Sequence, residues 1–306
     1  MTKVLVATVK PFIPKAVEGI KNIVSQAGYE FELLEEYTDQ AQFIDAVADA
    51  DALIIRSDKA TREVIQASKN LKIIVRAGAG YDNIDLEAAT EKGIVVMNTP
   101  GQNANAVAEL ALGMMVYFAR NGYNGKAGTE LKGKNLGIHA YGNVGKHVAA
   151  IAKGFGMHVY AFDPYIPKEV IENDGVVCVT SAEELYSICN YISLNIPATE
   201  QTIKSIDYQL LMKIPEPAVL VNTARKEVIH EDDLLRVFEE RSDFAYISDF
   251  APDCKNVMVE KYAGRFFFTP KKMGAQTAEA NINAGIAAAN QIRDYLENGD
   301  ATYQVN

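Results

Sequence analysis

Residues 136–163 contain two glycines and an acid at a spacing that suits nucleotide binding. Gly142-Asn143-Val144-Gly145 follows an apolar run and opens a segment with helical periodicity, and a second β-type run ends at Asp163. Backbone N–H groups and the dipole at such a helix start favour a bound pyrophosphate. Asp163 can accept hydrogen bonds from an adenosine ribose and repel the 2′-phosphate of NADP. No arginine follows in Pro164-Tyr165, so we expect the cofactor to be NAD.

The fingerprint is incomplete, because Ala140 stands where Gly-x-Gly-x-x-Gly has its first glycine. Gly-x-x-Gly alone is a weak signal, since any glycine-rich helix start would show it. The flanking strand patterns and the distance to the acid favour the cofactor interpretation.

The elements that must position these residues alternate between short apolar runs and helical patterns, which predicts parallel sheets covered by helices. Pro14 marks a helix start, and Gly28 and Gly93 mark helix ends. Helices are also predicted at 103–120 and 276–298. The predicted strands are Val4–Val9, Tyr29–Leu34, Ala52–Ile55, Lys72–Val75, Ile94–Met97, Val176–Val179, Tyr191–Leu194, Val219–Asn222, Ala245–Ser248 and Arg265–Phe268, besides the two of the cofactor segment.

The length of 306 residues suits two α/β domains. We expect the last helix to cross back to the first domain, which would then comprise residues 1–98 and 281–306 and bind substrate. Residues 99–280 would form an inserted NAD-binding Rossmann domain. The expected fold class is therefore α/β, with two doubly wound parallel-sheet domains.

Composition excludes several function classes. A formal charge of −10 and a pI near 5.0 argue against nucleic acid or an anionic membrane as the partner. Three unpatterned cysteines imply neither a disulfide framework nor a metal site. No stretch is apolar for long enough to span a bilayer, and the first residues are typical of a strand rather than a signal peptide, so we expect a cytoplasmic location.

Five sequence blocks carry a resemblance to a known family. Over nearly its whole length, the chain resembles the D-isomer-specific 2-hydroxyacid dehydrogenases. The resemblance implies a catalytic domain without a C-terminal regulatory extension. The blocks are RAGAGYDNIDLEAATEKGIVVMNTPG (76–101), the cofactor segment, SLNIPATEQT (193–202), VNTARKEVIHEDDL (221–234) and SDFAPD (248–253).

The resemblance also implies roles for single residues. Arg225 would grip the substrate's C1 carboxylate and polarise its C2 oxygen, and it follows a predicted strand at the carboxyl end where open α/β sheets bind ligands. Asp249 would contact the nicotinamide carboxamide. Further cofactor-binding residues would be Ala79, Asn195, Ile196, Pro197, Thr223, Ala224, Gly274 and Ala275. Residues that hold the phosphorylated substrate would be Arg56, Ser57, Lys59, Gly78, Ala79 and Gly80, although an ordinary solvated lysine explains Lys59 equally well.

The chain departs from the family in the acid–base pair. The usual histidine after Thr-Pro is absent from FFFTPKKMGAQT, and Cys254 replaces the usual glutamate five residues after Asp249. Either chemistry has been lost or a lysine replaces the histidine. A lysine has an ordinary pKa of about 10.4, and this pKa must fall by roughly two or three units before the amine can share its proton near neutrality. Loss of the glutamate and a nearby Arg225 both act in that direction.

Counting along this loop leaves two candidate lysines. From Thr269-Pro270 forward the count selects Lys271, whereas from Gly274 backward it selects Lys272, because the loop has one residue more than usual. We favour Lys272 as the catalytic base, since the glycine and the following helix fix its geometry. A solvated lysine pair still describes one of the two.

The resemblance implies NAD-dependent oxidation of D-3-phosphoglycerate to 3-phosphohydroxypyruvate, the first step of serine biosynthesis, in a short subgroup that uses lysine as the base. One alternative is a hydroxypyruvate, glyoxylate or other D-2-hydroxyacid reductase. Another is an NAD-sensing binding module without turnover, as in the C-terminal-binding-protein corepressors. A homodimer is also implied, with residues 103–133 at its contact.

Overall fold

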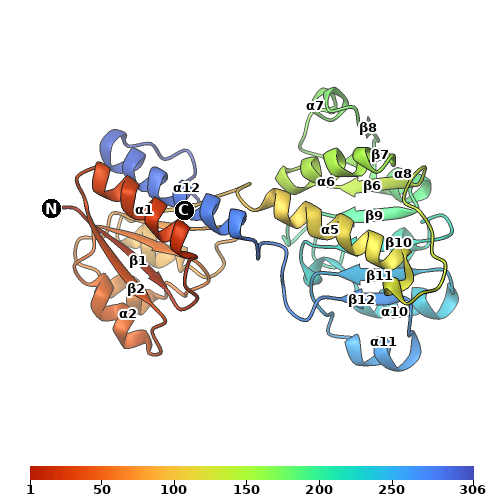
Figure 1. The fold of residues 1–306 in the computed structure, drawn as a ribbon, viewed down its shortest axis with the longest axis horizontal. Helices are drawn as coiled ribbons and strands as arrows, with labels where there is room; N and C mark the ends of the chain where they lie inside the picture. The colour runs from red at the N-terminus through yellow and green to blue at the C-terminus, as the bar shows by residue number, and fades with distance from the viewer. The chain divides into compact units, whose positions relative to one another are not determined.

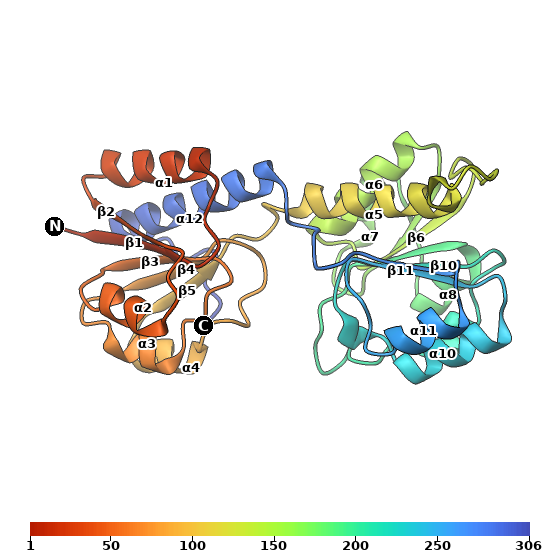
Figure 2. The same cartoon turned by 60° about the horizontal axis from the view of Figure 1, so that its bottom comes forward.

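The computed structural model describes residues 1–306, which form two compact α/β units (Figures 1 and 2). The first unit comprises Met1–Asn103 and Gln276–Asn306, and the second comprises Ala104–Ala275. The chain therefore leaves the first unit and returns to it, which confirms the predicted insertion of one parallel-sheet unit into another. The units divide at 103/104 and 275/276, whereas the sequence predicted limits at 98/99 and 280/281.

The first unit is a five-stranded parallel sheet in the order β2-β1-β3-β4-β5. Its helices α1 and α12 pack on one face, around Val4, Val6 and Ile54, and α2, α3 and α4 cover the other (Figure 2). The elements are β1 (Lys3–Thr8), α1 (Pro14–Gln26), β2 (Glu30–Glu35), α2 (Gln40–Val47), β3 (Ala52–Ile55), α3 (Arg62–Ala67), β4 (Ile73–Arg76), α4 (Leu86–Glu91), β5 (Val95–Asn98) and α12 (Ala278–Asn298).

The second unit is a seven-stranded parallel sheet in the order β12-β11-β10-β9-β6-β7-β8. The order reverses between β6 and β9, so the crevice at their carboxyl ends is where a doubly wound sheet binds its ligand. The elements are α5 (Ala104–Ala119), β6 (Asn135–His139), α6 (Asn143–Gly154), β7 (His158–Phe162), α7 (Lys168–Asn173), β8 (Val177–Cys178), α8 (Ala182–Ile188), β9 (Tyr191–Leu194), α9 (Tyr208–Leu211), β10 (Val219–Asn222), α10 (Glu231–Glu240), β11 (Ala245–Ser248), α11 (Lys255–Lys261) and β12 (Phe266–Phe268), with 3₁₀ turns at Asn121–Tyr123 and Lys226–Val228.

The predicted elements are present, with limits that differ by a few residues. The helix expected from residue 276 begins at Ala278, because Thr277 caps it by accepting a hydrogen bond from the Ala280 N–H at 3.1 Å. The strand expected at 176–179 is limited to two residues that pair with β7 at the sheet edge. Neither unit contains a helix long and apolar enough to cross a bilayer.

The turn between β6 and α6 explains the missing glycine of the fingerprint. Ala140 has a φ of 76°, in the left-handed region that glycine adopts without strain and other residues adopt at a cost of about 1–2 kcal/mol. Its N–H donates to the Phe162 carbonyl at 2.9 Å, which fixes the turn to β7. Ala140 therefore adopts the backbone conformation that the first glycine of the fingerprint would adopt, and it bears the strain that a glycine would avoid.

We predict that Ala140→Gly stabilises the second unit by roughly 0.5–1 kcal/mol, the relief of strain being partly offset by the greater flexibility of glycine in the unfolded chain. The measurement is the midpoint of urea unfolding. Gly264→Ala is the matched control, because Gly264 has a φ of 83° with no neighbour within 4 Å of an added Cβ, and it should lower the midpoint. A lower midpoint for Ala140→Gly would contradict the strain argument.

His139, the last residue of β6, is a histidine held in its neutral form. Burial lowers its pKa to about 4, against a smaller opposing effect of Asp163 and Glu183, and its Nδ1 lies 3.1 Å from the Tyr186 hydroxyl. Its pKa in the unfolded chain is about 6.5. Between pH 6.5 and 4 the unfolded chain therefore binds more protons at this site, so stability falls as the pH is lowered.

We predict that His139→Asn, which keeps an acceptor near Tyr186, flattens the loss of stability below pH 6.5 by up to about 1.4 kcal/mol per pH unit. Urea unfolding between pH 4 and pH 7 measures this slope. His158→Asn, at a solvent-exposed histidine, is the control and should keep the wild-type slope. Equal slopes in both variants would show that His139 does not carry the acid sensitivity.

Candidate active site

The glycine turn of the second unit leaves space where a pyrophosphate would lie. Gly142 is the N-cap of α6, and an added Cβ there would meet nothing within 4 Å. At Gly145 a Cβ would lie 2.4 Å from the Ala140 carbonyl oxygen and 3.0 Å from Ile138. One glycine thus keeps the helix start open and the other lets the helix pack on its strand, as the fingerprint requires.

Asp163 follows β7 and lies beside the glycine turn. Its two carboxylate oxygens accept hydrogen bonds from the Tyr141 and Tyr165 N–H groups, each at 2.8 Å. The carboxylate is half-buried, so it is fixed in direction and still reaches solvent. This is the placement that a ribose-binding acid needs.

The segment after β9 adds an unpaired acceptor to the same crevice. The Asn195 N–H donates to the His139 carbonyl at 2.9 Å, which joins the ends of β9 and β6 where the strand order reverses. The Asn195 Oδ1 is buried and has no hydrogen-bond partner. Such orphaned acceptors are rare in folded proteins, and a bound donor would satisfy this one. Ile196 is buried beside it, and Pro197 is exposed.

Two cationic side chains meet at one backbone carbonyl after β10. The Arg225 Nη1 donates to the Ala224 oxygen at 3.0 Å, and the Lys272 Nζ donates to the same oxygen at 3.2 Å. The ammonium also lies 5.7 Å from the centre of the Phe250 ring. The Thr269 hydroxyl lies 2.8 Å from the Lys271 carbonyl oxygen and 3.0 Å from the Asp249 Oδ1, so these two acceptors share its one proton. The structure thus brings Lys272 to Arg225.

Asn222 holds the turn that presents this carbonyl. Its Oδ1 accepts from the Ala224 N–H and its Nδ2 donates to the Arg225 carbonyl, both at 2.9 Å. The side chain is fully buried at the end of β10, and Thr223 next to it is buried as well. Sequence reasoning did not single out Asn222, although an Asn two residues before such a turn is a known turn signal.

Asp249, predicted to contact the nicotinamide, is fully buried at the end of β11. Its Oδ1 accepts from the Met273 N–H at 2.7 Å and the Thr269 hydroxyl at 3.0 Å, and its Oδ2 accepts from the Gly274 N–H at 2.7 Å. Both oxygens therefore bind the segment that carries the lysine pair. Each carboxylate oxygen has two lone pairs, so Oδ2, which accepts one bond, keeps a site for a further donor such as a nicotinamide carboxamide. Gly274 is buried and Ala275 half-buried beyond it.

Cys254 does not supply an acid in place of the usual glutamate. Burial raises the pKa of its thiol to about 12, and the neighbouring Glu231 acts in the same direction. The Glu231 carboxylate accepts from the Cys254 N–H at 2.7 Å and the Asp253 N–H at 2.9 Å. The thiol is thus protonated near neutrality, and no group of three His, Cys, Asp or Glu side chains could hold a metal ion.

The first unit places an arginine at the carboxyl end of β3. The Arg56 Nη1 donates to the Lys10 carbonyl at 2.8 Å and the Pro11 carbonyl at 2.9 Å, and the guanidinium lies 4.9 Å from the centre of the Phe12 ring. Burial lowers the pKa of this guanidinium. Ser57 and Lys59 are exposed, and neither is bonded to the Arg56 side chain.

Arg76 is a second arginine at this edge, and sequence reasoning missed it as a candidate. It ends β4, pairs in register with Ile55, and donates from Nε to the Arg56 carbonyl at 3.0 Å. A Cβ at Gly78 would lie 1.5 Å from the Arg76 Nη1, so a side chain there would require the end of the Arg76 side chain to move. The sequence pattern could have indicated Arg76, because Arg56 and Arg76 stand at the ends of adjacent parallel strands.

The predicted backbone donors lie in the turn after β4. The Gly78 N–H donates to the Arg76 carbonyl at 2.8 Å, and its role toward an anionic ligand stays a prediction. Ala79 accepts a hydrogen bond from the Asn98 Nδ2 at 2.6 Å through its carbonyl, and its side chain is exposed. Gly80 is half-buried.

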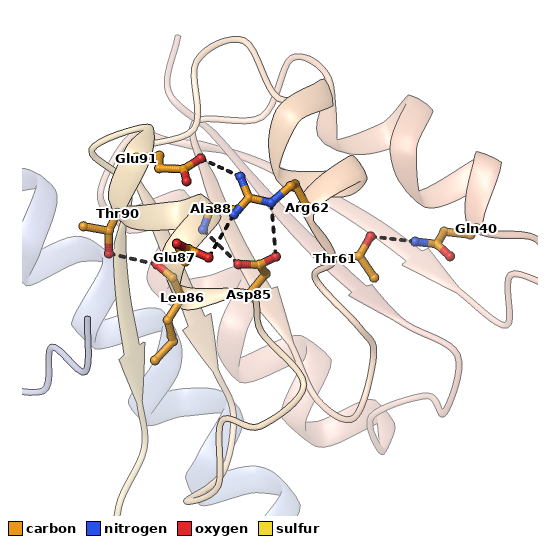
Figure 3. Close-up of polar contacts among 9 residues, drawn as sticks. All are labelled: Gln40, Thr61, Arg62, Asp85, Leu86, Glu87, Ala88, Thr90 and Glu91. Carbon is orange, nitrogen blue, oxygen red and sulfur yellow. Dashed lines mark hydrogen bonds and ion pairs between the residues drawn. The ribbon is translucent and has the colours of Figure 1, made fainter.

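The loops that carry these residues are tied to each other. Ala60 pairs with Ile84 in an isolated bridge, and the Asn83 Nδ2 donates to the carbonyls of Asp58 at 2.6 Å and Arg56 at 3.3 Å. Behind them Arg62 reaches three carboxylates around α4 (Figure 3), namely Asp85 at 3.6 Å, Glu87 at 3.4 Å and Glu91 at 2.5 Å. The loops after β3 and β4, which carry the two arginines, are thus held together by these backbone and side-chain bonds.

Comparison with known proteins identifies the family. The model of the D-isomer specific 2-hydroxyacid dehydrogenase catalytic domain matches residues 5–306. D-3-phosphoglycerate dehydrogenase of Methanocaldococcus jannaschii is 36% identical over 100% of this chain, which spans 60% of that relative. Hydroxypyruvate reductase of Thermotoga maritima is 35% identical over 86% of this chain and 90% of its own length.

A solved structure is more similar still. The crystal structure of NAD+-bound 3-phosphoglycerate dehydrogenase of Entamoeba histolytica is 49% identical, with a TM-score of 0.89 over 100% of this chain and 98% of that one. The family match covers both units and every residue of the candidate site. The chain therefore belongs to the D-isomer-specific 2-hydroxyacid dehydrogenase family.

Proposed function

We propose that this chain binds NAD and oxidises D-3-phosphoglycerate to 3-phosphohydroxypyruvate, the first step of serine biosynthesis. The observation that carries the proposal is the meeting of Lys272 and Arg225 at the Ala224 carbonyl oxygen. It supplies a base and a carboxylate-binding group side by side, on the sheet whose crevice suits a dinucleotide.

The residues at that crevice fit NAD. The open N-cap at Gly142 suits a pyrophosphate, and the fixed carboxylate of Asp163 suits a ribose with a free 2′-hydroxyl. The buried, unpaired Asn195 Oδ1 fits a donor on the ligand. Bound NAD would accept the hydride from C2. The related structure from Entamoeba histolytica holds NAD+, which supports this choice.

In the mechanism, Lys272 takes the proton of the C2 hydroxyl and Arg225 holds the C1 carboxylate and the C2 oxygen. The guanidinium beside Lys272 disfavours a second positive charge, so it promotes the neutral amine that can accept a proton. A guanidinium fork matches a planar carboxylate. Lys272 thereby performs the task of the absent histidine.

The phosphate of the substrate is assigned to the first unit. Arg56 and Arg76 end adjacent strands, and the exposed Ser57 and Lys59 follow on the same loop. Arginine suits phosphate because its planar donors bind two oxygens at once. This feature favours a phosphorylated acid over D-lactate or D-glycerate.

A hydroxypyruvate reductase is the second candidate, favoured by the Thermotoga maritima relative. Such an enzyme would use the same Lys272 and Arg225 and would not depend on Arg56. An NAD-sensing module without turnover is disfavoured by the meeting of these two side chains. The homodimer through residues 103–133 and the cytoplasmic location stay predictions.

We predict that the purified protein reduces NAD, and not NADP, with D-3-phosphoglycerate. Absorbance of NADH, measured in parallel with D-lactate and D-glycerate, tests this. Arg56→Gln should raise the KM for the phosphorylated acid at least about tenfold, because a charge-assisted bond to phosphate is lost. Lys59→Ala is the control and should change it less. Equal turnover of all three acids would favour the reductase.

We predict that Lys272→Ala lowers kcat by about 10²–10⁴, the usual contribution of general base catalysis, and leaves NADH binding nearly intact. In the wild type, oxidation should accelerate as the pH rises, because only the neutral amine accepts a proton. The variant should lose that dependence. Lys271→Ala is the matched control on the neighbouring residue, and the assignment is wrong if Lys271→Ala proves the more damaging change.

A further inference from the structure

The lysine pair lies on a segment without regular structure. No helix or strand is formed between Phe268, at the end of β12, and Ala278, at the start of α12. A flexible four-carbon side chain on such a segment has no fixed position unless its backbone is held. The side chain that holds it is Asp249.

The Asp249 carboxylate forms a three-bond clamp on this segment. It accepts from the two N–H groups that follow Lys272, those of Met273 and Gly274, and from the Thr269 hydroxyl three residues before it. The bonds span both sides of Lys272, so they restrict its backbone from two directions. A buried charge needs this many donors, and the three bonds supply them.

The geometry is specific to a carboxylate and to a glycine. One oxygen accepts from Met273 while the other accepts from Gly274, whereas an amide side chain would offer only one accepting oxygen. A Cβ on Gly274 would lie 3.0 Å from the Asp249 Oδ2 and 3.1 Å from Val107. A side chain at this position would therefore require the Asp249 carboxylate or Val107 to move by a few tenths of an ångström.

Asp249 and the turn that carries Arg225 are both hydrogen-bonded to the same residue, Asn222. The Asp249 N–H donates to the Asn222 carbonyl at 3.0 Å, and Asn222 in turn fixes Ala224 and Arg225 through its own side chain. Both partners of the Lys272–Ala224 bond are thus anchored to the adjacent ends of β10 and β11. A shift of either anchor would separate the ammonium from the carbonyl.

We propose that Asp249 is a positioning residue for Lys272, holding the base against Arg225 through Met273, Gly274 and Thr269. This role rests on the function proposed above and is additional to the nicotinamide contact that the family resemblance implies, for which Oδ2 keeps a lone pair. It acts on the proton-transfer step through the position of the base.

The test uses the full chain with two variants that remove clamp bonds. Asp249→Asn loses one acceptor and faces an N–H group with its own NH₂, and Thr269→Val removes one bond at nearly constant shape. Reductive methylation with ¹³C-formaldehyde makes each lysine amine visible by NMR, and the Lys272 resonance is identified by its absence in K272R. Kinetics with D-3-phosphoglycerate and NADH binding by fluorescence complete the comparison.

In both variants we expect the Lys272 resonance to move toward those of solvent-exposed lysines. We also expect kcat to fall about 10- to 100-fold in both variants, as misplacement of a catalytic group causes, with NADH affinity within about twofold in Thr269→Val, which leaves the Asp249 carboxylate in place. Thr269→Ser keeps the hydroxyl and should therefore show the wild-type Lys272 resonance and the wild-type kcat. Asp243→Asn, at a carboxylate paired with Arg241 elsewhere in the second unit, is the control for general loss of stability and should leave the resonance unchanged.

An unchanged Lys272 resonance in Asp249→Asn, together with weakened NADH binding, would overturn the proposal in favour of the nicotinamide contact. If the wild type oxidises none of the acids but the resonance still moves in both clamp variants, the proposed function fails while the positioning role stands.

Discussion

Two positive charges donating to one carbonyl oxygen form the interaction on which the candidate site depends. A carbonyl has two lone pairs, so the Ala224 oxygen can accept from both Arg225 and Lys272. The arrangement brings the two cationic side chains to one acceptor. The contact that holds Arg225 in its turn is therefore also the contact that fixes the end of the Lys272 side chain.

Parallel strand pairing makes this arrangement possible. Because β10, β11 and β12 run in the same direction in register, the residues that follow them emerge at one edge. Asn222, Asp249 and Thr269 stand at those ends, and their side chains bind one another's loops rather than solvent. Buried polar groups at strand ends must find partners, so satisfying them also orders the loops that carry Arg225 and Lys272.

The sequence predicted the sheets because buried parallel strands are nearly continuous apolar runs, as in Val219–Asn222 and Ala245–Ser248. It also predicted the glycine turn and Asp163, whose spacing is local. It favoured Lys272 and kept Lys271 as the alternative, because the contact of a lysine with the Arg225 turn depends on bonds between residues far apart in the chain, such as Asp249 to Met273 and Gly274. The occupied Gly78 N–H and the left-handed Ala140 depend on backbone angles that residue type does not fix.

The change of the catalytic pair has a consistent physical basis. A histidine base needs a carboxylate to stabilise its charged form, whereas a carboxylate near Lys272 would favour the ammonium and hold back its proton. Cys254 occupies the glutamate's position with a thiol whose pKa burial raises to about 12, so it adds no negative charge near neutrality. The carboxylate of Glu231, which neighbours Cys254, accepts hydrogen bonds from the backbone N–H groups of Asp253 and Cys254. Under the proposed mechanism, the loss of the glutamate and the gain of the lysine therefore act in the same direction.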